Sequence, residues 1–494
     1  MNADQSVAVV LKGKDPCNPK GEADGARVVF LWEAVNTYGP QTPRTQQLST
    51  SLRERGFCVD HLVLRRPAPS GWFKEASLEN ATYIFPAEDD PTCTYEAAIN
   101  PALEFVRGAN VLIGAHENGW SLFGGVALSK SSGIPLVLPL LSDVLGVAKA
   151  GQIGNLGYGR FRRSRAAIWS WKEKRRTDSA SRARKELERL YVSGAPDVVV
   201  FPSRFVRDSL KRRMLPAAGT EFMQFFTPVS EHSIEPILAR DDNVSRKSSE
   251  EKSVRRVVVI GRISGEKGQA IAIRAHAKVV KRDPHQLVLV GADQSSGRLQ
   301  GLIDRLGVQG TVERVGHLDE PLTELDAHSA LLIPSLSEGA PAILIEAILL
   351  NRVPIVSTRV GYAAEYLPAA QLCRPGSVSS LRRAITTLVR GEISLMPDET
   401  VHRVAELHSF DRFVDVYVAA ITRFAPLNPS LASEHTTASV PTAASVPTTA
   451  AGASVPTTAA GASVPTTAAA ATGDLSVPTT NLADSATPTA GRRR

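Results

Sequence analysis

The stretch IPSLSEGAPAILIEAILL, residues 333–350, is an apolar run that contains two carboxylates, Glu338 and Glu346. It begins as the end of a buried strand, turns at Ser337–Gly339, and continues as a helix with Pro341 in its first turn. Glu338 is therefore expected on the loop at the carboxyl end of the strand, and Glu346 in the second turn of the helix. An apolar core gains nothing from two acids, so the pattern favours a binding role for both.

The same turn also offers backbone N–H groups, because the first amides of a helix have no partner within it. The amides of Ala340, Ala342 and Ile343, beside Gly339, are predicted to point toward the edge of the sheet where Glu338 lies. Such amides bind phosphate, and carboxylates accept hydrogen bonds from hydroxyl groups.

A purely structural alternative exists for both acids. Glu338 would then cap the helix, and Glu346 would pair with Arg352 or Arg359.

Strand-like and helix-like segments alternate on both sides of this stretch. Continuous apolar runs of this kind suit strands that are buried on both faces of a parallel sheet. In the first half they are VVFLW (28–32), VLIGA (111–115), PLVLP (135–139) and DVVVFP (197–202); in the second they are VVVIG (257–261), QLVLVG (286–291), ALLIPS (330–335) and PIVST (354–358). The fold class is therefore α/β, with two Rossmann-like domains that face each other across a cleft.

Composition places the domain boundaries. We predict an N-terminal leader (1–25), a first Rossmann-like domain (26–213), an interdomain linker (214–253), a second Rossmann-like domain (254–400), a C-terminal helix (401–426) and a tail (427–494). The tail has no aromatic residue and repeats SVPT, so it cannot bury enough apolar surface to fold and is predicted to be disordered.

Basic charge is concentrated in one segment. Of 57 Lys and Arg against 50 Asp and Glu in the chain, residues 160–189 hold twelve against four. Because the rest of the chain is nearly neutral, no nucleic-acid partner is expected. Trp169 and Trp171 lie among these cations. The segment suits peripheral contact with the inner membrane surface, an anionic acceptor, or a solvated basic insertion.

Cysteine usage and hydropathy point to an interior compartment. Cys17, Cys58, Cys93 and Cys373 lie far apart, which argues against a structural zinc site and a disulfide framework. The chain has no apolar run near the ~18 residues of a membrane-spanning helix, and its first residues lack a signal-peptide pattern. A cytoplasmic protein is expected.

A second motif precedes the opening stretch. After the strand at 257–260 the chain reads Gly261-Arg262-Ile263-Ser264-Gly265-Glu266-Lys267-Gly268 and then enters a helix. Glycines at a strand-to-helix turn let the backbone approach an anion, and Arg262 and Lys267 add two charges there. The pattern is neither a P-loop nor a dinucleotide fingerprint. It indicates a phosphate site or, as the alternative, a solvated loop with two surface cations.

Together these motifs resemble the retaining glycosyltransferases of family GT4, which have the GT-B fold. The resemblance rests on PSxxEGxPxxxxEA around Glu338 and Glu346, the upstream Gly-Arg-x-x-x-Glu-Lys-Gly, and the downstream Ser357-Thr358-Arg359-Val360-Gly361. It is close over 254–370 and looser over 26–210.

The resemblance implies roles for the matched residues. Arg262 and Lys267 would bind the donor diphosphate and offset the charge of the leaving group; Glu338 would lie against the sugar, and Glu346 would hold the ribose hydroxyls. Gly261, Gly339, Ala340, Pro341, Ala342 and Ile343 would complete the diphosphate site. No metal ion or other cofactor is implied, and the donor is a nucleotide-diphosphate sugar.

Several positions depart from the family pattern. The glycine-rich loop after the first strand retains Gly39, followed by Pro40. Asn351 stands near the usual glycine at a helix end, where it tolerates the left-handed conformation. Tyr362 stands at a second glycine position.

The acceptor side departs further. Leu141 occupies the place of a histidine that faces the acceptor in many members, which leaves Ser142, Asp143 and His116 as candidates to line the acceptor cleft. His116 is also compatible with a capping or packing role.

Two functions are compatible with the sequence. The first is a retaining, metal-independent glycosyltransferase with an unidentified acceptor. The alternative is a non-catalytic GT-B protein that binds a nucleotide sugar or a polyanion.

Overall fold

The computed structural model of the chain describes residues 9–11, 25–32, 41–64, 78, 81–85, 95–115, 124–141, 196–213, 219–229, 234–235, 254–326, 328–393 and 395–425. The basic segment 160–189 and the tail 427–494 lie outside these residues, so their predicted roles stay predictions.

The first half forms a sheet in the order β1-β4-β3-β2-β5-β6-β7-β8. Its strands are β1 (Val9–Leu11), β2 (Arg27–Trp32), β3 (Cys58–Leu64), β4 (Ala81–Phe85), β5 (Val111–Gly114), β6 (Leu136–Pro139), β7 (Val198–Phe201) and β8 (Glu221–Gln224). All neighbours pair in parallel except β1, which is antiparallel to β4. The predicted α/β class is confirmed.

Both faces of this sheet are covered, which explains its continuous apolar strands. Val28, Phe30 and Trp32 of β2 pack on one face, with α1 (Gln41–Glu54), while Val29 and Leu31 pack on the other. The second face is covered by α2 (Tyr95–Val106) and α3 (Gly125–Ser132). A further helix, α7 (Arg204–Arg213), follows β7.

Two strands lie in segments for which no strand was predicted. β1 lies within the predicted leader, 1–25, and β8 lies within the predicted linker, 214–253. Both are short, with three and four residues. Edge strands of this length carry too little hydrophobic pattern to be recognised from sequence.

The second half forms a sheet in the order β11-β10-β9-β12-β13-β14, with parallel pairing throughout. The strands are β9 (Arg256–Ile260), β10 (Gln286–Val290), β11 (Val312–Gly316), β12 (Ser329–Ile333), β13 (Pro354–Ser357) and β14 (Leu372–Cys373). The strand-like runs predicted for this half thus form one sheet.

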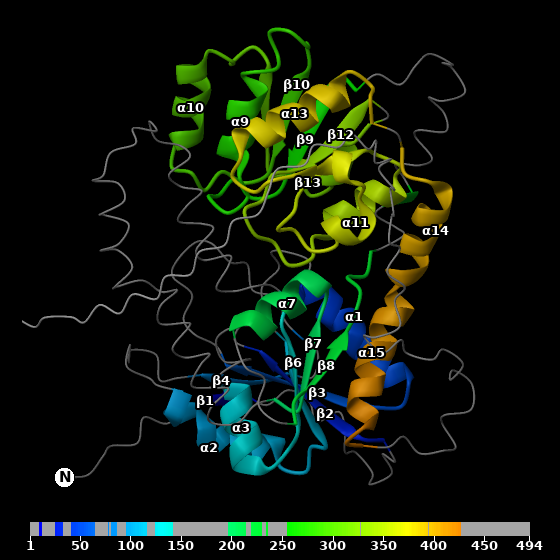
Figure 1. Cartoon of the computed structure of the whole chain (residues 1–494). Helices are drawn as coiled ribbons and strands as arrows, with labels where there is room; N and C mark the ends of the chain where they lie inside the picture. The colour runs from blue at the N-terminus through cyan, green and yellow to red at the C-terminus, as the bar shows by residue number, and fades with distance from the viewer. Residues whose placement is uncertain are drawn as a thin grey trace, which may run out of the picture. The chain divides into compact units, whose positions relative to one another are not determined.

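Helices cover both faces of the second sheet (Figure 1). One face packs against α9 (Gln269–His276), α10 (Arg298–Leu306) and α13 (Val378–Val389). The other packs against α11 (Ala342–Leu349), α12 (Ala363–Tyr366) and α14 (Asp398–Leu407). Two short 3₁₀ helices, η2 (Pro321–Glu324) and η3 (Ala369–Gln371), complete this half. Asn351, which follows α11, has φ of +53°, so the predicted left-handed residue at this helix end is confirmed.

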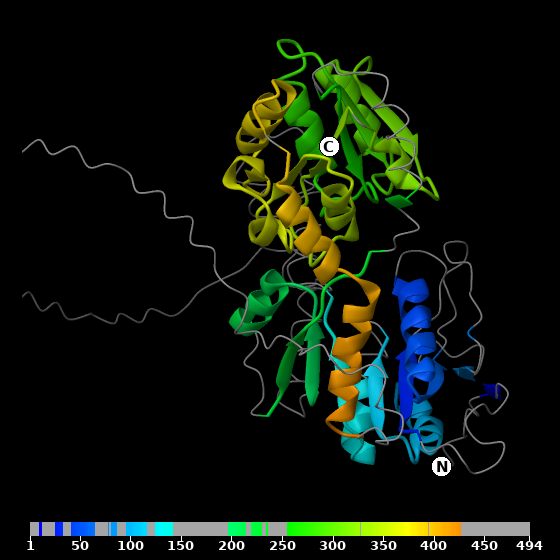
Figure 2. The same ribbon diagram turned by 90° about the vertical axis from the view of Figure 1, so that its right-hand side faces the viewer.

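The last described helix returns to the first half. Two helices, α14 and α15 (Phe410–Thr422), occupy the region predicted as one C-terminal helix. The buried side of α15, which includes Phe413 and Tyr417, belongs to the same core as α1 and β2. Arg55 pairs with Asp415 of α15 at 3.1 Å. The α15 ribbon accordingly runs beside α1 and β8 in both views (Figure 1 and Figure 2).

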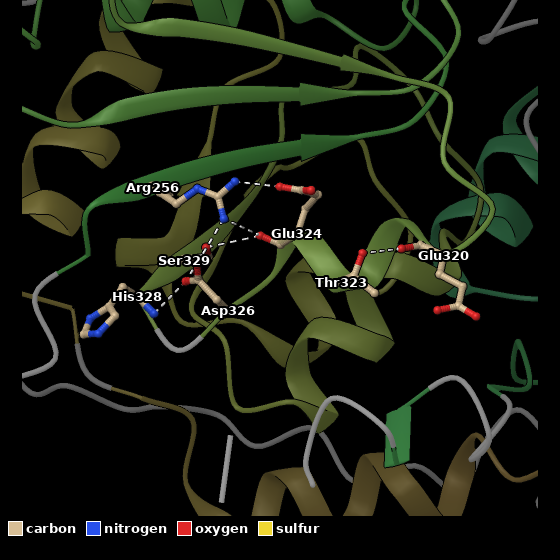
Figure 3. Close-up of polar contacts among 7 residues, drawn as sticks. All are labelled: Arg256, Glu320, Thr323, Glu324, Asp326, His328 and Ser329. Carbon is tan, nitrogen blue, oxygen red and sulfur yellow. Dashed lines mark hydrogen bonds and ion pairs between the residues drawn. The ribbon is translucent and has the colours of Figure 1, made fainter. Parts of the chain in front are cut away.

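A polar cluster joins the amino ends of two central strands in the second sheet (Figure 3). Arg256, the first residue of β9, donates to Glu324 at 2.6 Å and to Asp326 at 3.0 Å. Burial raises the pKa of Asp326, but hydrogen bonds from Ser329 and Arg256 outweigh burial, so its pKa is lowered. The cluster stabilises the edge of the sheet opposite to the carboxyl ends of its strands.

Cys58 corrects one expectation from the sequence. It is disulfide-bonded, although the wide spacing of the cysteines argued against a disulfide framework. Spacing along the chain was a poor guide because a parallel sheet brings distant segments side by side. Cys373 is a free, buried thiol. Within the described ranges, no helix is long and apolar enough to cross a membrane.

Candidate active site

The second sheet diverges between β9 and β12. From β9 the chain proceeds through β10 to β11 at one edge, and from β12 it proceeds through β13 to β14 at the other. Loops that leave the carboxyl ends of β9 and β12 therefore part at this point, and open α/β sheets bind their ligands there. These are the loops that carry the two predicted motifs.

The loop after β9 brings its glycines close to the loop after β12. Gly261 and Gly268 have φ of +139° and +74°, conformations that side chains disfavour. A Cβ at Gly268 would lie 2.2 Å from the carbonyl oxygen of Pro334, and the amide of Leu336 donates to the carbonyl of Glu266 at 2.8 Å. The two loops are thus fixed to each other by their backbones.

Lys267 and Glu338 meet where these loops touch. The Lys267 ammonium forms an ion pair with Oε1 of Glu338, and the Ser335 hydroxyl donates to Oε2 at 2.8 Å. Both charged side chains are mostly buried, with 22% and 18% of their surface exposed. Arg262 is more open, at 61% exposed, and lies 3.7 Å from Glu266. The structure therefore brings together Gly261, Lys267 and Glu338, with Arg262 at the rim.

The main chain at Glu338 is held on its other side by the segment after β13. The amide of Glu338 donates to the carbonyl of Arg359, and the amide of Gly361 donates to the carbonyl of Glu338, both at 3.0 Å. A Cβ at Gly361 would lie 1.6 Å from the carbonyl oxygen of Gly339. Only glycine permits this approach.

Residues of the first half bind the carbonyl groups of Gly339 and Ala340, the two residues that follow Glu338. The Ser203 hydroxyl donates to the carbonyl of Gly339 at 2.7 Å, and that of Thr227 donates to the carbonyl of Ala340 at 3.4 Å. Because the C=O and N–H of a trans peptide point in opposite directions, the amide of Ala340 is directed away from Ser203. Pro341 is the cap residue before α11.

The amides of Ala340, Ala342 and Ile343 were predicted to be free for a phosphate. Among the described residues, no acceptor is hydrogen-bonded to any of the three. Each therefore retains a donor that an anionic ligand can use.

Glu346 lies in the second turn of α11, half-buried. Burial raises the pKa of its carboxyl to about 7, and the charge of Arg44 on α1 partly opposes this increase. The sequence suggested Arg352 or Arg359 as its structural counter-charge. Instead the structure identifies Arg44, from the other half of the chain, as the cation that acts on Glu346.

The remaining predicted site residues fall outside the described residues. Gly39 and His116 are among them, as are Ser142 and Asp143. Leu141 is described and packs against the core of the first half. Within the described residues no group of three or more His, Cys, Asp or Glu side chains could hold a metal ion.

The structural contacts of Tyr362 were not predicted from the sequence. It has φ of +69°, a strained value for a bulky residue. Its hydroxyl donates to the carbonyl of Pro202 and accepts from the amide of Thr227 at 3.0 Å. Its ring stacks between Phe226 and Tyr366, with centroids 6.4 and 5.5 Å away. These contacts join the segment after β13 to the segments that follow β7 and β8.

The first sheet has its own divergence point, between β2 and β5. A cavity of about 20 Å³ lies next to this point, lined by Phe30 within β2, by residues at or just beyond the ends of β5 and β6, by α1 and by α15. Its lining includes Phe30, Ala115, Leu141, Phe225, Tyr417 and Arg44. Arg44 is the only charged residue in the described lining.

A known protein family matches part of the second half of the chain, where the two charged loops lie. The model of the family described as "Glycosyl transferases group 1" matches residues 241–406, which include both loops. Residues 241–406 are thus similar to the glycosyl transferases group 1 family. The predicted resemblance is thereby confirmed for this part of the chain.

One curated relative also matches. An uncharacterized glycosyltransferase of Methanocaldococcus jannaschii is 35% identical over 100 residues, which are 20% of this chain and 24% of that protein. The alignment thus covers only about a quarter of the relative's length.

Solved structures extend the likeness beyond the group 1 domain. Sucrose-phosphate synthase from Thermosynechococcus elongatus has a TM-score of 0.58 at 18% identity, covering 81% of this chain and 98% of that one. The apo lipopolysaccharide outer core galactosyltransferase WaaB has a TM-score of 0.56 at 15% identity, covering 80% and 99%. Anabaena HepE, solved with UDP and glucose, has a TM-score of 0.54 at 15% identity, covering 81% and 100%. These similarities show the fold, which is GT-B.

Proposed function

We propose that the chain is a retaining glycosyltransferase that transfers a sugar from a nucleotide-diphosphate sugar to an acceptor hydroxyl without a metal ion. The observation that carries the proposal is the Lys267–Glu338 ion pair at the divergence point of the group 1 domain. Catalysis at such a site requires a cation for the leaving group and an anion near the sugar, and this pair supplies both.

The diphosphate would lie against the loops after β9 and β12. Arg262 and Lys267 provide full charges there, and the amides of Ala340, Ala342 and Ile343 provide unpaired donors. An α-helix also places positive partial charge at its N-terminus, here at the start of α11. Support for a nucleotide donor comes from HepE, a protein of the same fold that was solved with UDP and glucose.

Donor binding would change the partner of Lys267. Its ammonium now binds Glu338, and a diphosphate oxygen within reach would share or replace this carboxylate. Glu338 would then be available to the sugar, where it stabilises positive charge at the anomeric carbon as the bond to the diphosphate breaks. Ser335, which donates to the other carboxylate oxygen, would hold the orientation of Glu338.

The transfer itself exchanges one bond at the anomeric carbon. The bond to the diphosphate oxygen breaks with its electron pair on that oxygen, the acceptor oxygen bonds to the same carbon, and the acceptor proton leaves to the released diphosphate or to solvent. Retention of configuration is carried over from the resemblance to GT4 enzymes. Metal independence rests on the ability of Arg262, Lys267 and the helix N-terminus to offset the new charge.

Glu346 would bind the ribose. Ribose hydroxyls can both donate and accept, and a carboxyl with a pKa of about 7 can do either near neutral pH. Because Glu346 lies in the second turn of α11, after the amides of Ala340, Ala342 and Ile343, it would lie on the nucleoside side of the diphosphate.

A donor panel tests the function. The full chain is mixed with UDP-, GDP- and ADP-sugars, and the melting temperature and the release of nucleoside diphosphate are measured for the wild type and for Glu338→Gln. We expect one donor to stabilise both proteins and to be consumed only by the wild type. A true donor at 100 times its Kd adds about 2.7 kcal/mol of stability.

If the Glu338→Gln protein turned over the donor as fast as the wild type, the proposed catalytic role of Glu338 would be wrong. Binding of a donor without release, with a broad set of acceptors present, would instead favour the non-catalytic nucleotide-sugar-binding protein.

A further inference from the structure

The cavity at the divergence point of the first sheet is a second place where the fold favours ligand binding. It lies beside Phe30 of β2 and next to the carboxyl end of β5, the two strands between which the first sheet diverges. Open α/β sheets bind ligands at such points. Arg262, Lys267 and Glu338 lie at the second sheet, so the proposed donor site does not assign a role to this cavity.

Arg44 gives the cavity its chemical character. Its side chain lines the cavity from the first turn of α1 and is half-buried. Burial lowers the pKa of its guanidinium, and Glu346 and the hydroxyls of Tyr362 and Tyr417 only partly oppose this effect. Among the described residues, none is hydrogen-bonded or ion-paired to Arg44. A desolvated cation without a hydrogen-bonding partner is costly, and an anion that binds it would offset this cost.

The rest of the lining limits what that anion can be. Phe30, Leu141 and Phe225 contribute apolar side chains, and Tyr417 contributes an aromatic ring. A cavity of about 20 Å³ holds one or two water-sized groups. A carboxylate or part of a phosphate fits this size, and a guanidinium binds either one through paired N–H donors.

We propose that this cavity is an acceptor subsite, in which Arg44 binds a carboxylate or phosphate group of the acceptor. The proposal deepens the proposed function and rests on it, because it names the class of acceptor: a hydroxyl compound that carries an anionic group. Leu141, at the position where the resemblance expected a histidine, would contribute apolar contact to this subsite.

The subsite can be tested without a donor. Inorganic phosphate and propionate are titrated calorimetrically into the full chain that carries Arg262→Gln and Lys267→Gln, which removes the donor-site cations. We expect at least one of the two anions to bind. Phosphate alone would indicate a phosphorylated acceptor, and propionate alone would indicate a carboxylic acid. Binding of neither anion overturns the proposal.

Three further variants in the same background locate that binding. Arg44→Gln should weaken it at least about tenfold, because a hydrogen-bonded charge pair is lost. Leu141→Phe should also weaken it, by filling the cavity while Arg44 is retained. Arg412→Gln, which removes an α15 cation that pairs with Glu406, should leave it unchanged. Equal binding with and without Arg44, or equal loss with Arg412→Gln, contradicts the assignment.

A transfer assay separates this proposal from the proposed function. Release of nucleoside diphosphate is compared for matched acceptors with and without an anionic group: glucose 6-phosphate with glucose, and glycerate with glycerol. We expect the wild type to prefer an anionic member, and Arg44→Gln to raise the acceptor KM at least about tenfold and by more than it raises the donor KM, which it can affect only through the charge of Glu346.

If no donor binds, the proposed function fails, while the anion titration still decides whether Arg44 forms a site. If donors react but neutral acceptors serve equally well, only the subsite fails.

Discussion

The two sheets of the molecule diverge at corresponding points, and the two points differ in charge. Between β9 and β12 the loops carry Arg262, Lys267 and Glu338, and the last two are paired at the base of the site. Between β2 and β5 the described residues enclose an apolar cavity with a single cation, Arg44. The same topology therefore carries two different charge environments, which the side chains at the strand ends determine.

The largest effect on activity is expected from a substitution at the charged divergence point, between β9 and β12. Lys267→Gln removes the cation nearest to Glu338 and should lower kcat/KM by a factor of about 30 to 900, which corresponds to about 2–4 kcal/mol of transition-state stabilisation. Steady-state kinetics with the donor identified by the panel measure the effect. Arg412→Gln serves as the matched control, because it removes an outlying cation of α15. A loss below tenfold would mean that Lys267 is not part of the transition-state site.

A second large effect concerns stability in both halves. Burial lowers the pKa of His61, in the first half, and of His276, in the second, to about 3. The unfolded chain binds protons below its ordinary histidine pKa of about 6.5, whereas the folded chain does not. Stability is therefore complete above pH 6.5 and falls as the pH falls toward 3, by about 2 kcal/mol per histidine at pH 5.

Urea unfolding at pH 7 and at pH 5 measures this loss. His61→Asn and His276→Asn should each reduce the pH dependence of the unfolding midpoint. An unfolding midpoint that does not move between the two pH values would contradict the neutral, buried state of these histidines.

The contact between Gly339 and Gly361 predicts a smaller loss of stability. A Cβ at Gly361 would overlap the carbonyl oxygen of Gly339, so Gly361→Ala should destabilise the chain by about 1–3 kcal/mol and weaken donor binding. Gly301, on α10, has open space at its Cβ, and Gly301→Ala should stabilise by about 0.5–1 kcal/mol. Thermal unfolding of the two variants compares them. Equal melting temperatures would show that the loop relaxes around the extra methyl group.

The smallest expected effect is a change of donor affinity with pH, which depends on the ionisation of Glu346. Its pKa of about 7 means that raising the pH from 6 to 8 ionises the carboxyl, which then accepts hydrogen bonds from both ribose hydroxyls. Donor affinity should rise over this range by up to about tenfold. Glu346→Gln should bind more weakly and without this pH dependence. A flat profile in the wild type would separate Glu346 from the ribose.

Much of the second half could be predicted from its sequence. Its strands follow from continuous apolar runs, and its site follows from residues that are local in sequence: Lys267 in one loop, Glu338 in another, and the helix amides beside it. Neighbouring parallel strands bring such loops together, so a correct strand assignment was sufficient to predict that the two motifs meet.

The contributions of the first half could not be predicted in this way. In the sequence, Arg44 has the pattern of an ordinary cation on a solvent-exposed helix. Its burial depends on Phe225 and Tyr417, which are distant from it in the chain. Ser203 and Tyr362 act across the two halves, through backbone carbonyls that no side-chain pattern reveals. The disulfide of Cys58 and the return of α15 to the first sheet depend on long-range contacts as well.

The difference between the two divergence points is tested most directly by equilibrium binding of nucleoside diphosphates. UDP, GDP and ADP are titrated into the wild type, Arg262→Gln/Lys267→Gln and Arg44→Gln, each as the full chain. We predict that one nucleotide binds the wild type and Arg44→Gln with affinities within about tenfold of each other, because Arg44 acts on the site only through the charge of Glu346, and binds the double variant at least about a hundredfold more weakly. Unchanged affinity in the double variant, or a loss confined to Arg44→Gln, would contradict the account.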